Sequence, residues 1–477
     1  MKYKSCLKKD GYYVCKNKNS IKLIEEIKND LTVTPHKFGI SFGVNEKPEY
    51  FKVFRETENN IIIPKYYGLK KLGQPEKNKQ IIGESVSITF KGGLRDTQKE
   101  IIKQVMCKLE KDDGGLICLS CGGGKTVLAL YIASLLNVKT LIIVHKGFLL
   151  NQWKERIEQF TDSPIGIIQR DKVEIEDKHF VIGMLQSIAK EKYESDIFMD
   201  FGLVIFDEAH HAPSKYFSRA LPLISCKKTL ALSATPKRSD KLEKVLHWYF
   251  GPIIYQYNLE ENNNVLTKIY KYNIIHKDFI EKKQRFTGEV NRPGTITNLI
   301  TIGRRNRFII DLVEDILNEK ERKIIILSER IEHLQLLKKR LDERNLCTSG
   351  FYIGGMKQIK LDESAKCQII FGTFQMASEA LDIKGLNTLI MATPRREIEQ
   401  TIGRITRDPN SNVRPMVIDI LDNLDSFIRQ GYYRRNFYRK NGYQIIFAEV
   451  EDNVIIKEDD ITMTYNIVNN DYAFIDV

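Results

Sequence analysis

No stretch of this sequence is apolar over the length that a membrane-spanning helix requires, although 42% of its 477 residues are hydrophobic. The first five residues, Met-Lys-Tyr-Lys-Ser, lack the apolar core of a secretory signal. The eight cysteines are scattered, and no second Cys or His pair completes the spacing of Cys118 and Cys121, so the sequence indicates neither a metal site nor a disulfide framework. We therefore expect a soluble intracellular protein with reduced thiols and no membrane partner.

Acidic residues are in the minority among the charged ones. The chain has 62 Asp and Glu against 74 Lys and Arg, a formal net charge of +12. This excess is consistent with a polyanionic partner such as nucleic acid. The length is sufficient for two or three domains, each with its own core.

The most informative stretch reads Gly-Leu-Ile-Cys-Leu-Ser-Cys-Gly-Gly-Gly-Lys-Thr and begins at Gly115. Residues 116–119 predict a short buried strand, and the apolar positions that follow Thr126 predict a helix. A strand, a glycine-rich turn and a helix form a loop in which backbone N–H groups and the helix N-terminus hold phosphates. The strict pattern has a glycine where this sequence has Leu119, and the alternative is a glycine-rich turn before an ordinary helix.

In the phosphate-binding interpretation, Lys125 neutralises the β- and γ-phosphates and Thr126 binds Mg²⁺. The residues predicted to line the nucleotide in this loop are Ser120, Cys121, Gly122, Gly123, Gly124, Lys125 and Thr126. Gln98 precedes the loop by one predicted helix, 99–109, which we expect Asp96 or Thr97 to cap. An amide in that position can read the adenine edge, because it offers both a donor and an acceptor.

Strands and helices alternate after the loop. The predicted strands are 140–144, 180–183, 203–206 and 228–232, and 148–160 is a predicted amphipathic helix. This alternation predicts a parallel, doubly wound sheet with its site at the carboxyl ends of the strands. Polar residues stand at two of these ends, Asp207 and Glu208 at one and Ser233 at the other, which predicts a single active site.

The acidic pair has a ready chemical role beside a phosphate loop. Asp207 would hold Mg²⁺, and Glu208 would accept a proton from the attacking water. The alternative is a solvated pair at the start of a loop, and the four apolar residues before Asp207 favour the catalytic interpretation.

A second alternating series begins at Arg304 and contains no second phosphate loop. Two sheets with one nucleotide site indicate a cleft that the second domain closes. Gln400, Arg404 and Arg407 lie at or near a predicted helix, and the two arginines, three residues apart, can share one face of it. Guanidinium groups suit the charge that develops on a γ-phosphate, and the alternative is a pair of surface arginines.

Two regions leave their role open. Residues 1–85 form an N-terminal module with short strand-like runs. It is either a docking site for nucleic acid or another partner, or a small packing domain with a solvated basic face. Basic and aromatic residues alternate between 429 and 440, where they either grip phosphates and stack bases or form the packing stripe of a helix.

The ordered motifs resemble those of the superfamily 2 helicases. The matching segments are 119–126 (motif I), 207–210 (motif II), 233–238 (motif III), 372–383 (motif V) and 400–407 (motif VI). Arg95 and Gln98 stand where the adenine-side motif of the superfamily would be, and Thr401 departs from a common arginine. The Cys-Gly phosphate loop, the run ending at Asp240 and the Gln-x-Ile-Gly-Arg form are similar to the XPB-type branch and its viral relatives, such as poxvirus transcript-release helicases.

The resemblance implies an α/β fold of two tandem RecA-like, doubly wound parallel-sheet domains with a small mixed N-terminal module. The expected bounds are 1–85 for the module, 86–250 for the ATP-binding domain, 251–300 for the connection, 301–448 for the second domain and 449–477 for the tail. The expected cofactors are ATP and Mg²⁺. The residues that the resemblance assigns to coupling are His210, Ser233, Ala234 and Thr235, and those that it assigns to nucleic acid are Lys146, Gln186, Ser187, Gly354, Gly355 and Thr373.

The implied activity is ATP-dependent movement on, or unwinding of, nucleic acid. The branch favours DNA, with a role in viral transcript release beside the transcription machinery, or in DNA repair or recombination. If the source is a virus, a viral factory or the virion is the expected location. The alternatives are an RNA helicase or RNA-dependent ATPase, and a nucleic-acid-binding scaffold that no longer hydrolyses ATP.

Overall fold

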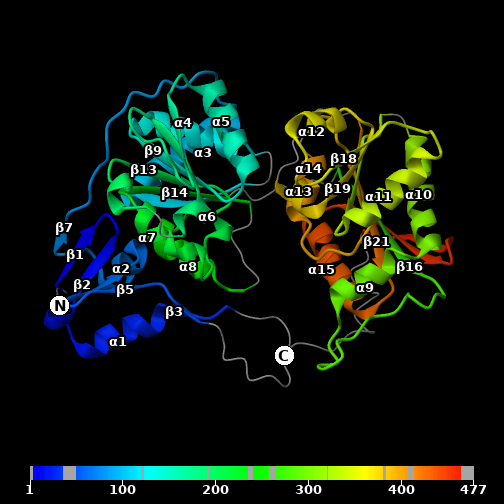
Figure 1. The fold of residues 1–477 in the computed structure, drawn as a ribbon, viewed down its shortest axis with the longest axis horizontal. Coiled ribbons are helices and arrows are strands. Elements are labelled where there is room, and N and C mark those ends of the chain that lie inside the picture. Colours follow the sequence, from blue (N-terminus) through cyan, green and yellow to red (C-terminus); the bar gives the residue numbers. More distant parts are fainter. Residues whose placement is uncertain are drawn as a thin grey trace. The chain divides into compact units, whose positions relative to one another are not determined.

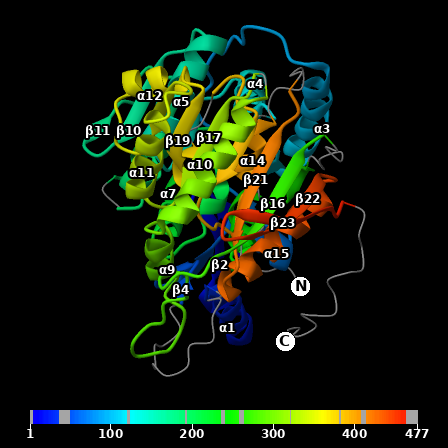
Figure 2. The ribbon, with the colours of Figure 1, turned by 90° about the vertical axis from the view of Figure 1, so that its right-hand side faces the viewer.

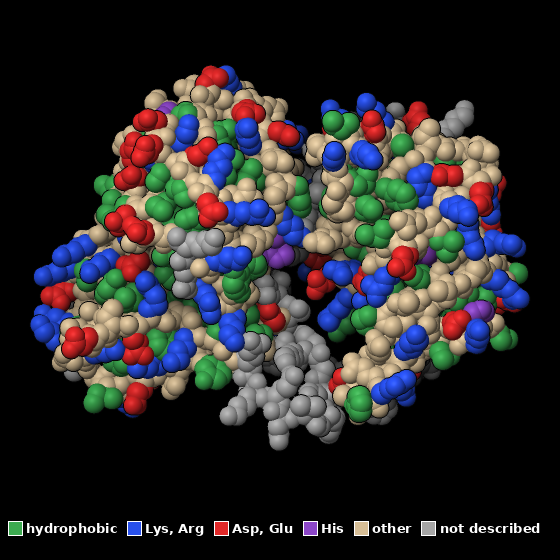
Figure 3. Space-filling model, viewed as in Figure 1, with side chains coloured by type: hydrophobic (Ala, Val, Ile, Leu, Met, Phe, Trp, Pro, Cys, Tyr) green, Lys and Arg blue, Asp and Glu red, His purple; other side chains and the backbone are tan. Residues whose placement is uncertain are grey.

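The computed structural model describes residues 4–35, 50–119, 123–190, 193–234, 240–256, 264–319, 321–379, 383–406 and 413–462. The chain forms two compact units, Met1–Tyr257 and Asn258–Val477, which are described separately (Figure 1). Among these residues, no helix combines the length and the apolar composition needed to cross a membrane. Lysine and arginine side chains are spread over both units, with acidic side chains among them (Figure 3).

The first unit is built on an eight-stranded sheet. In spatial order its strands are β11 (Lys172–Val173), β10 (Ile165–Gln169), β12 (Phe180–Met184), β9 (Thr140–Val144), β13 (Leu203–Phe206), β14 (Lys228–Ser233), β8 (Gly114–Cys118) and β15 (Ile253–Gln256). All neighbours are parallel except β10 and β11. The predicted parallel sheet is therefore confirmed, and the carboxyl ends of its strands meet at one edge.

Apolar residues cover both faces of this sheet, because alternate side chains of each strand point to opposite sides. One face packs against α3 (Asp96–Asp112), α4 (Lys125–Leu136) and α5 (Gly147–Phe160). The other packs against α6 (Leu185–Ile188), α7 (Leu221–Ile224) and α8 (Glu243–Phe250). Strands buried on both sides explain the unbroken apolar runs in the sequence.

Within the first unit, the N-terminal module forms its own five-stranded sheet, which packs beside the larger sheet through α8. Its strands, in spatial order, are β5 (Arg55–Glu56), β6 (Asn60–Ile63), β2 (Gly11–Cys15), β1 (Ser5–Lys8) and β7 (Lys77–Asn78); α1 (Ile21–Asp30), α2 (Lys65–Leu72) and the pair β3 (Thr32–Val33) and β4 (Phe51–Lys52) accompany them. Helix α2 packs on α8, where the rings of Tyr67 and Trp248 meet edge to face at 5.6 Å. The Lys65 ammonium donates to the Lys227 carbonyl at 2.9 Å, so the module is held by polar as well as apolar contacts.

The second unit has its own eight-stranded sheet. In spatial order its strands are β18 (Ser349–Tyr352), β19 (Ile369–Thr373), β17 (Ile324–Ser328), β20 (Thr388–Met391), β21 (Met416–Asp422), β16 (Leu266–Asn273), β22 (Gln444–Glu451) and β23 (Val454–Asp460). Only β22 and β23 are antiparallel. Figure 2 shows β21, β16, β22 and β23 together at one side of this sheet.

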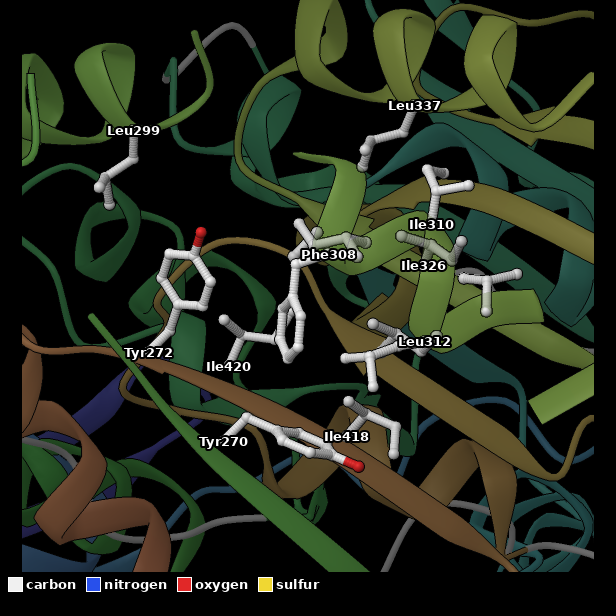
Figure 4. Packing of buried hydrophobic residues seen from close by; sticks show 14 of the residues in the cluster. Tyr270, Tyr272, Leu299, Phe308, Ile310, Leu312, Ile326, Leu337, Ile418 and Ile420 are labelled. Carbon is white, nitrogen blue, oxygen red and sulfur yellow. The ribbon is translucent and has the colours of Figure 1, made fainter. Parts of the chain in front are cut away.

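Helices again cover both faces. One face packs against α9 (Arg292–Leu299), α10 (Gly303–Leu317) and α11 (Ile331–Asp342), where the ring of Phe308 lies 5.7 Å from that of Tyr270 and 5.2 Å from that of Tyr272 (Figure 4). The opposite face packs against α12 (Gln358–Ala365), α13 (Phe374–Glu379), α14 (Glu399–Ile405) and α15 (Asp425–Lys440). The two units thus repeat one three-layer architecture.

Strand β16 comes from the range predicted as a connection, and β22 and β23 span the boundary predicted at 448. The β16 sequence, Leu-Thr-Lys-Ile-Tyr-Lys-Tyr-Asn, places lysines at positions that are only partly buried. Because the lysines interrupt the apolar pattern, the sequence does not indicate that this segment is an inner strand. In the structure it pairs with both β21 and β22. Strand β23 is the outermost strand, and all seven of its residues are exposed.

Two buried ion pairs attach helices to β21. The Arg305 guanidinium donates to both carboxylate oxygens of Asp422, at 2.6 and 2.8 Å, and Arg434 of α15 donates to both oxygens of Asp419, at 2.8 and 2.7 Å. Tyr438 also donates to Asp419, at 3.0 Å. None of these side chains is more than 1% exposed, so each charge depends on its partner.

We expect Asp419→Asn to lower the thermal unfolding midpoint strongly, because it leaves the Arg434 charge buried without a counter-ion. Breaking a buried pair costs about 3–5 kcal/mol. The control is Asp425→Asn on the exposed first turn of α15. Equal midpoints for the two variants, measured by calorimetry, would contradict this interpretation.

Candidate active site

The phosphate loop connects β8 to α4, as predicted. Gly124 is the N-cap of α4 and has φ +78°, a backbone conformation that glycine adopts without strain. A Cβ at this position would lie 2.4 Å from Nε2 of Gln98, so a larger residue would also displace the Gln98 amide. Gly123 and Lys125 flank this position, Thr126 follows in the first turn of α4, and Ser120, Cys121 and Gly122 lie outside the described residues.

Gln98 links the start of α3 to this loop. Its Oε1 accepts the backbone N–H of Arg95 at 3.0 Å, and its Nε2 lies against Gly124. Arg95 is therefore the N-cap, and the predicted cap at Asp96 or Thr97 is wrong because a glutamine side chain performs the capping. The adenine role of Gln98 and Arg95 stays a prediction.

Asp207 follows β13 and is held on three sides. Its Oδ2 accepts the indole N–H of Trp153 at 2.8 Å, its Oδ1 accepts the backbone N–H of Glu208 at 3.0 Å, and its own N–H donates to the Ile143 carbonyl at 3.0 Å. Burial, and next the charge of Glu208, raise the pKa of Asp207 to about 6, while Lys125 and Trp153 act in the opposite direction. The carboxylate is thus oriented and poorly hydrated.

Glu208 stands opposite the lysine of the phosphate loop. Its Oε1 lies 3.6 Å from Nζ of Lys125, with both side chains largely buried. Its backbone is left-handed, φ 47° and ψ 52°, which for a non-glycine residue stores about 1–3 kcal/mol of strain.

The donor set fits Mg²⁺. Two adjacent carboxylates, Asp207 and Glu208, face one ammonium, so the site carries an excess of negative charge that a divalent cation would balance. Hydroxyl and carboxylate oxygens are the ligands that Mg²⁺ prefers, and Thr126 and Asp207 supply them.

Three histidines form a row beside the acidic pair. The Nδ1 atom of His210 lies 3.3 Å from the Ser233 hydroxyl and 3.3 Å from Oε2 of Glu208. The ring of His211 lies 4.2 Å from His210 and 4.0 Å from His145 at the end of β9. Burial, and then the neighbouring His211, lower the pKa of His145, so its ring is neutral. The row connects the carboxyl ends of three strands.

The remaining coupling residues adjoin this row. Ser233, the last residue of β14, is completely buried, and Ala234 after it is half-buried. Thr235 lies outside the described residues.

Three residues predicted to contact nucleic acid lie in the first unit. Lys146 is the half-buried N-cap of α5. The Gln186 amide donates to the His145 carbonyl, and the Ser187 hydroxyl accepts the N–H of Arg170 at 3.0 Å. These two side chains are therefore engaged with the backbone.

The others lie in the second unit. Gly354 and Gly355 follow β18 and have no atom within 4 Å of their Cβ positions, so this loop is open. The Thr373 hydroxyl accepts the N–H of Met376 at 3.4 Å at the start of α13. Contact of these residues with nucleic acid stays a prediction.

Helix α14 carries Gln400, which is half-buried, and Arg404, which is 8% exposed; Thr401 beside them is buried. The helix ends at Ile405, and Arg407 lies outside the described residues. The shared helical face of Arg404 and Arg407 therefore stays a prediction.

Sequence reasoning did not assign Trp153, His145 or His211 to the site. Trp153 belongs to the buried stripe of α5, with Leu149, Leu150 and Ile157. A buried indole N–H requires a hydrogen-bond acceptor, so the sequence indicates that Trp153 has a polar partner. It does not indicate that this partner is Asp207, which lies 54 residues away.

We expect Trp153→Phe to lower nucleic-acid-stimulated turnover by about 10-fold or more while the KM for ATP changes little. The variant keeps the ring but loses a hydrogen bond to a charged group, which is worth about 1.5–3 kcal/mol. The control is Trp248→Phe, since the chain contains only these two tryptophans. Equal activity of both variants would show that the indole does not position Asp207.

The loop, the acidic pair and the His–Ser contact lie at the strand ends of one parallel sheet, and comparisons with known proteins identify the class of protein. Residues 91–238 match the family described as the res subunit of type III restriction enzymes. The chain is 40% identical over 445 residues to a protein named as an ATP-dependent RNA helicase in Acanthamoeba polyphaga mimivirus, covering 91% of this chain and 85% of the relative. The chain belongs to the superfamily 2 helicases, enzymes that hydrolyse ATP in dependence on nucleic acid.

Within the superfamily, the chain is similar to both XPB-type and viral members, as the motifs predicted. It is 35% identical over 196 residues to the DNA 3'-5' translocase XPB2 of Sulfurisphaera tokodaii, which covers 41% of this chain and 43% of that protein. A solved fragment described as an HsdR subunit of a type I restriction enzyme from Vibrio vulnificus YJ016 superimposes with a TM-score of 0.55 at 17% identity, covering 77% of this chain and 71% of the fragment. At 17% identity, the likeness to the HsdR fragment concerns the fold alone.

Proposed function

We propose that the protein is an ATP-driven DNA translocase that moves on or unwinds its substrate. The observation that carries the proposal is the meeting of Lys125 with Glu208, 3.6 Å apart, beside the buried Asp207 at the carboxyl edge of one parallel sheet. A positive phosphate ligand, a metal-binding carboxylate and a base are thereby available within one site.

The Lys125–Glu208 pair suggests how the site is activated. ATP brings phosphates that compete for Lys125, which frees Glu208 to accept a proton from the attacking water. Bound Mg²⁺ would be held by Thr126 and Asp207 and would neutralise charge on the phosphates. The histidine row then offers a route from hydrolysis to the nucleic acid, since His210 contacts Glu208 and His145 adjoins Lys146.

DNA is the proposed substrate because the motif forms are of the XPB type and a relative is a named DNA translocase. RNA is the second candidate, since a relative that covers far more of the chain is named as an RNA helicase. The proposed cellular role is transcript release, beside the transcription machinery, or DNA repair in a large DNA virus.

The test is ATP hydrolysis measured with single-stranded DNA, duplex DNA and RNA of matched sequence. We expect DNA to stimulate most, and Lys125→Ala to abolish hydrolysis by weakening nucleotide phosphate binding. Binding of single strands should fall with salt, with a log–log slope of roughly −0.7 per neutralised phosphate. Stimulation by RNA alone would establish the second candidate, and wild-type turnover of Lys125→Ala would refute both.

A further inference from the structure

One face of helix α15 packs against the core of the second unit, and the opposite face is exposed. Its buried residues, four or three positions apart, are Phe427, Gly431, Arg434 and Tyr438. The opposite face, which we name the α15 face, exposes Arg429, Tyr432, Tyr433, Asn436, Arg439 and Lys440. The contrast among the tyrosines matters: Tyr438 is completely buried and donates to Asp419, whereas Tyr432 and Tyr433 are 41% and 52% exposed.

Each exposed tyrosine has an arginine over its ring. The Arg396 guanidinium carbon lies 3.8 Å from the ring centroid of Tyr433, and that of Arg435 lies 4.8 Å from the ring centroid of Tyr432. A guanidinium over a ring is attracted to the ring face and so restricts its orientation. Neighbouring residues point about 100° apart around a helix, so the two rings form a platform with two separate stacking positions, one beside Arg396 and one beside Arg435.

The platform lies in an excess of positive charge. Burial, and next the charge of Arg439, lower the pKa of Arg435, so that a nearby anion would relieve this repulsion. Of the acidic side chains near the helix, Asp425 and Glu281 lie at the first turn, and Glu399, with Glu397 near it, lies within the field of Lys440 at the last. Asp419 is buried on the opposite face, where Arg434 neutralises it. The middle of the α15 face is therefore basic and aromatic.

Helix α15 is also attached to the segment that leads into α14. Nη1 of Arg434 donates to the Arg395 carbonyl at 2.7 Å, and Arg396 belongs to the same segment, three residues before α14 begins. A ligand on the tyrosines would thus contact the residues that immediately precede the helix carrying Arg404.

We propose that the α15 face binds single-stranded nucleic acid, with bases stacked on Tyr432 and Tyr433 and phosphates paired with the surrounding arginines. Stacking on aromatic rings together with basic side chains is how sequence-tolerant single-strand sites work, and every base offers a ring face. This surface lies outside the helicase motifs, and the inference rests on the proposed nucleic-acid-dependent function.

The experiment measures the affinity of the full chain for a fluorescent oligothymidine of 30 nucleotides, without ATP, over a series of salt concentrations. Stacking energies for two bases predict that Tyr432→Ala with Tyr433→Ala weakens binding by roughly 30-fold or more with the salt slope unchanged. Arg429→Gln with Arg439→Gln should instead reduce the slope, by roughly 0.7 for each lost phosphate contact. The control is Phe286→Ala, because Phe286 is a fully exposed aromatic side chain elsewhere in the same unit.

The outcomes separate this inference from the proposed function. If the wild type binds the oligonucleotide and hydrolyses ATP in response, but the double tyrosine variant binds as tightly as Phe286→Ala, the α15 face is not a nucleic-acid site and this inference is wrong while the proposed function stands. If the wild type binds no nucleic acid at all, the proposed function fails, and this inference fails with it. Thermal unfolding midpoints equal to that of the wild type show that lost affinity is not lost folding.

Discussion

Glu208→Gln should bind ATP and barely hydrolyse it. The amide cannot accept the proton of the attacking water, and loss of a positioned general base costs about 10²- to 10⁴-fold in turnover. The substitution also removes the negative charge that lies 3.6 Å from the Lys125 ammonium, so this carboxylate no longer competes with the phosphates for it. We therefore expect nucleotide affinity to stay constant or to rise.

The measurement pairs equilibrium binding of a fluorescent ATP analogue with stimulated hydrolysis. Glu155→Gln is the matched control, because Glu155 is an exposed residue on the surface of α5. If Glu208→Gln fails to bind nucleotide, Glu208 serves the metal or the structure, and its assignment as the base is wrong.

Arg404→Ala, a change in the other unit, should show the same separation of binding from catalysis as Glu208→Gln. We propose that Arg404 stabilises charge on the γ-phosphate during transfer, a role worth on the order of 10³ to 10⁵ in rate. Nucleotide affinity should remain within a few-fold, since the contact would form only in the transition state. Arg404→Lys should rescue poorly, because a point charge cannot reproduce the planar guanidinium fork.

Arg307→Ala, which removes an exposed arginine from α10, is the control for this experiment. Because Arg404 is 8% exposed, the thermal midpoint of each variant is measured alongside turnover. Near-normal hydrolysis by a stable Arg404→Ala protein would show that this residue is structural and that the second unit contributes no arginine from α14 to catalysis.

The parts of the fold that are predictable from sequence are those governed by local patterns. Strands β9, β13 and β20 begin and end where the apolar runs do, because a central parallel strand is buried on both faces. The positions of the phosphate loop and the acidic pair are predictable for the same reason, because each follows an apolar run that forms a buried strand. Strand β16 was hidden because its lysines break the apolar run, although its pairing partners on both sides are clear in the structure.

The contacts that complete the candidate site depend instead on long-range geometry. No local pattern indicates that the indole of Trp153 meets Asp207, or that Gln98 both caps α3 and lies against Gly124. The same holds for His145, whose stacking on His211 joins residues more than sixty positions apart. Such contacts arise only after the sheet brings the strand ends together.

Strand β23 has a consequence for handling the protein. Within the described residues it is the open edge of the second sheet, and such an edge is a template for another strand. Its first half, Val454, Ile455 and Ile456, is exposed and apolar, and its second half carries Lys457, Glu458, Asp459 and Asp460. The net negative second half discourages a second copy from pairing there, and salt screens that repulsion. Raising the salt concentration therefore acts twice, because it releases nucleic acid and at the same time removes the barrier to self-association.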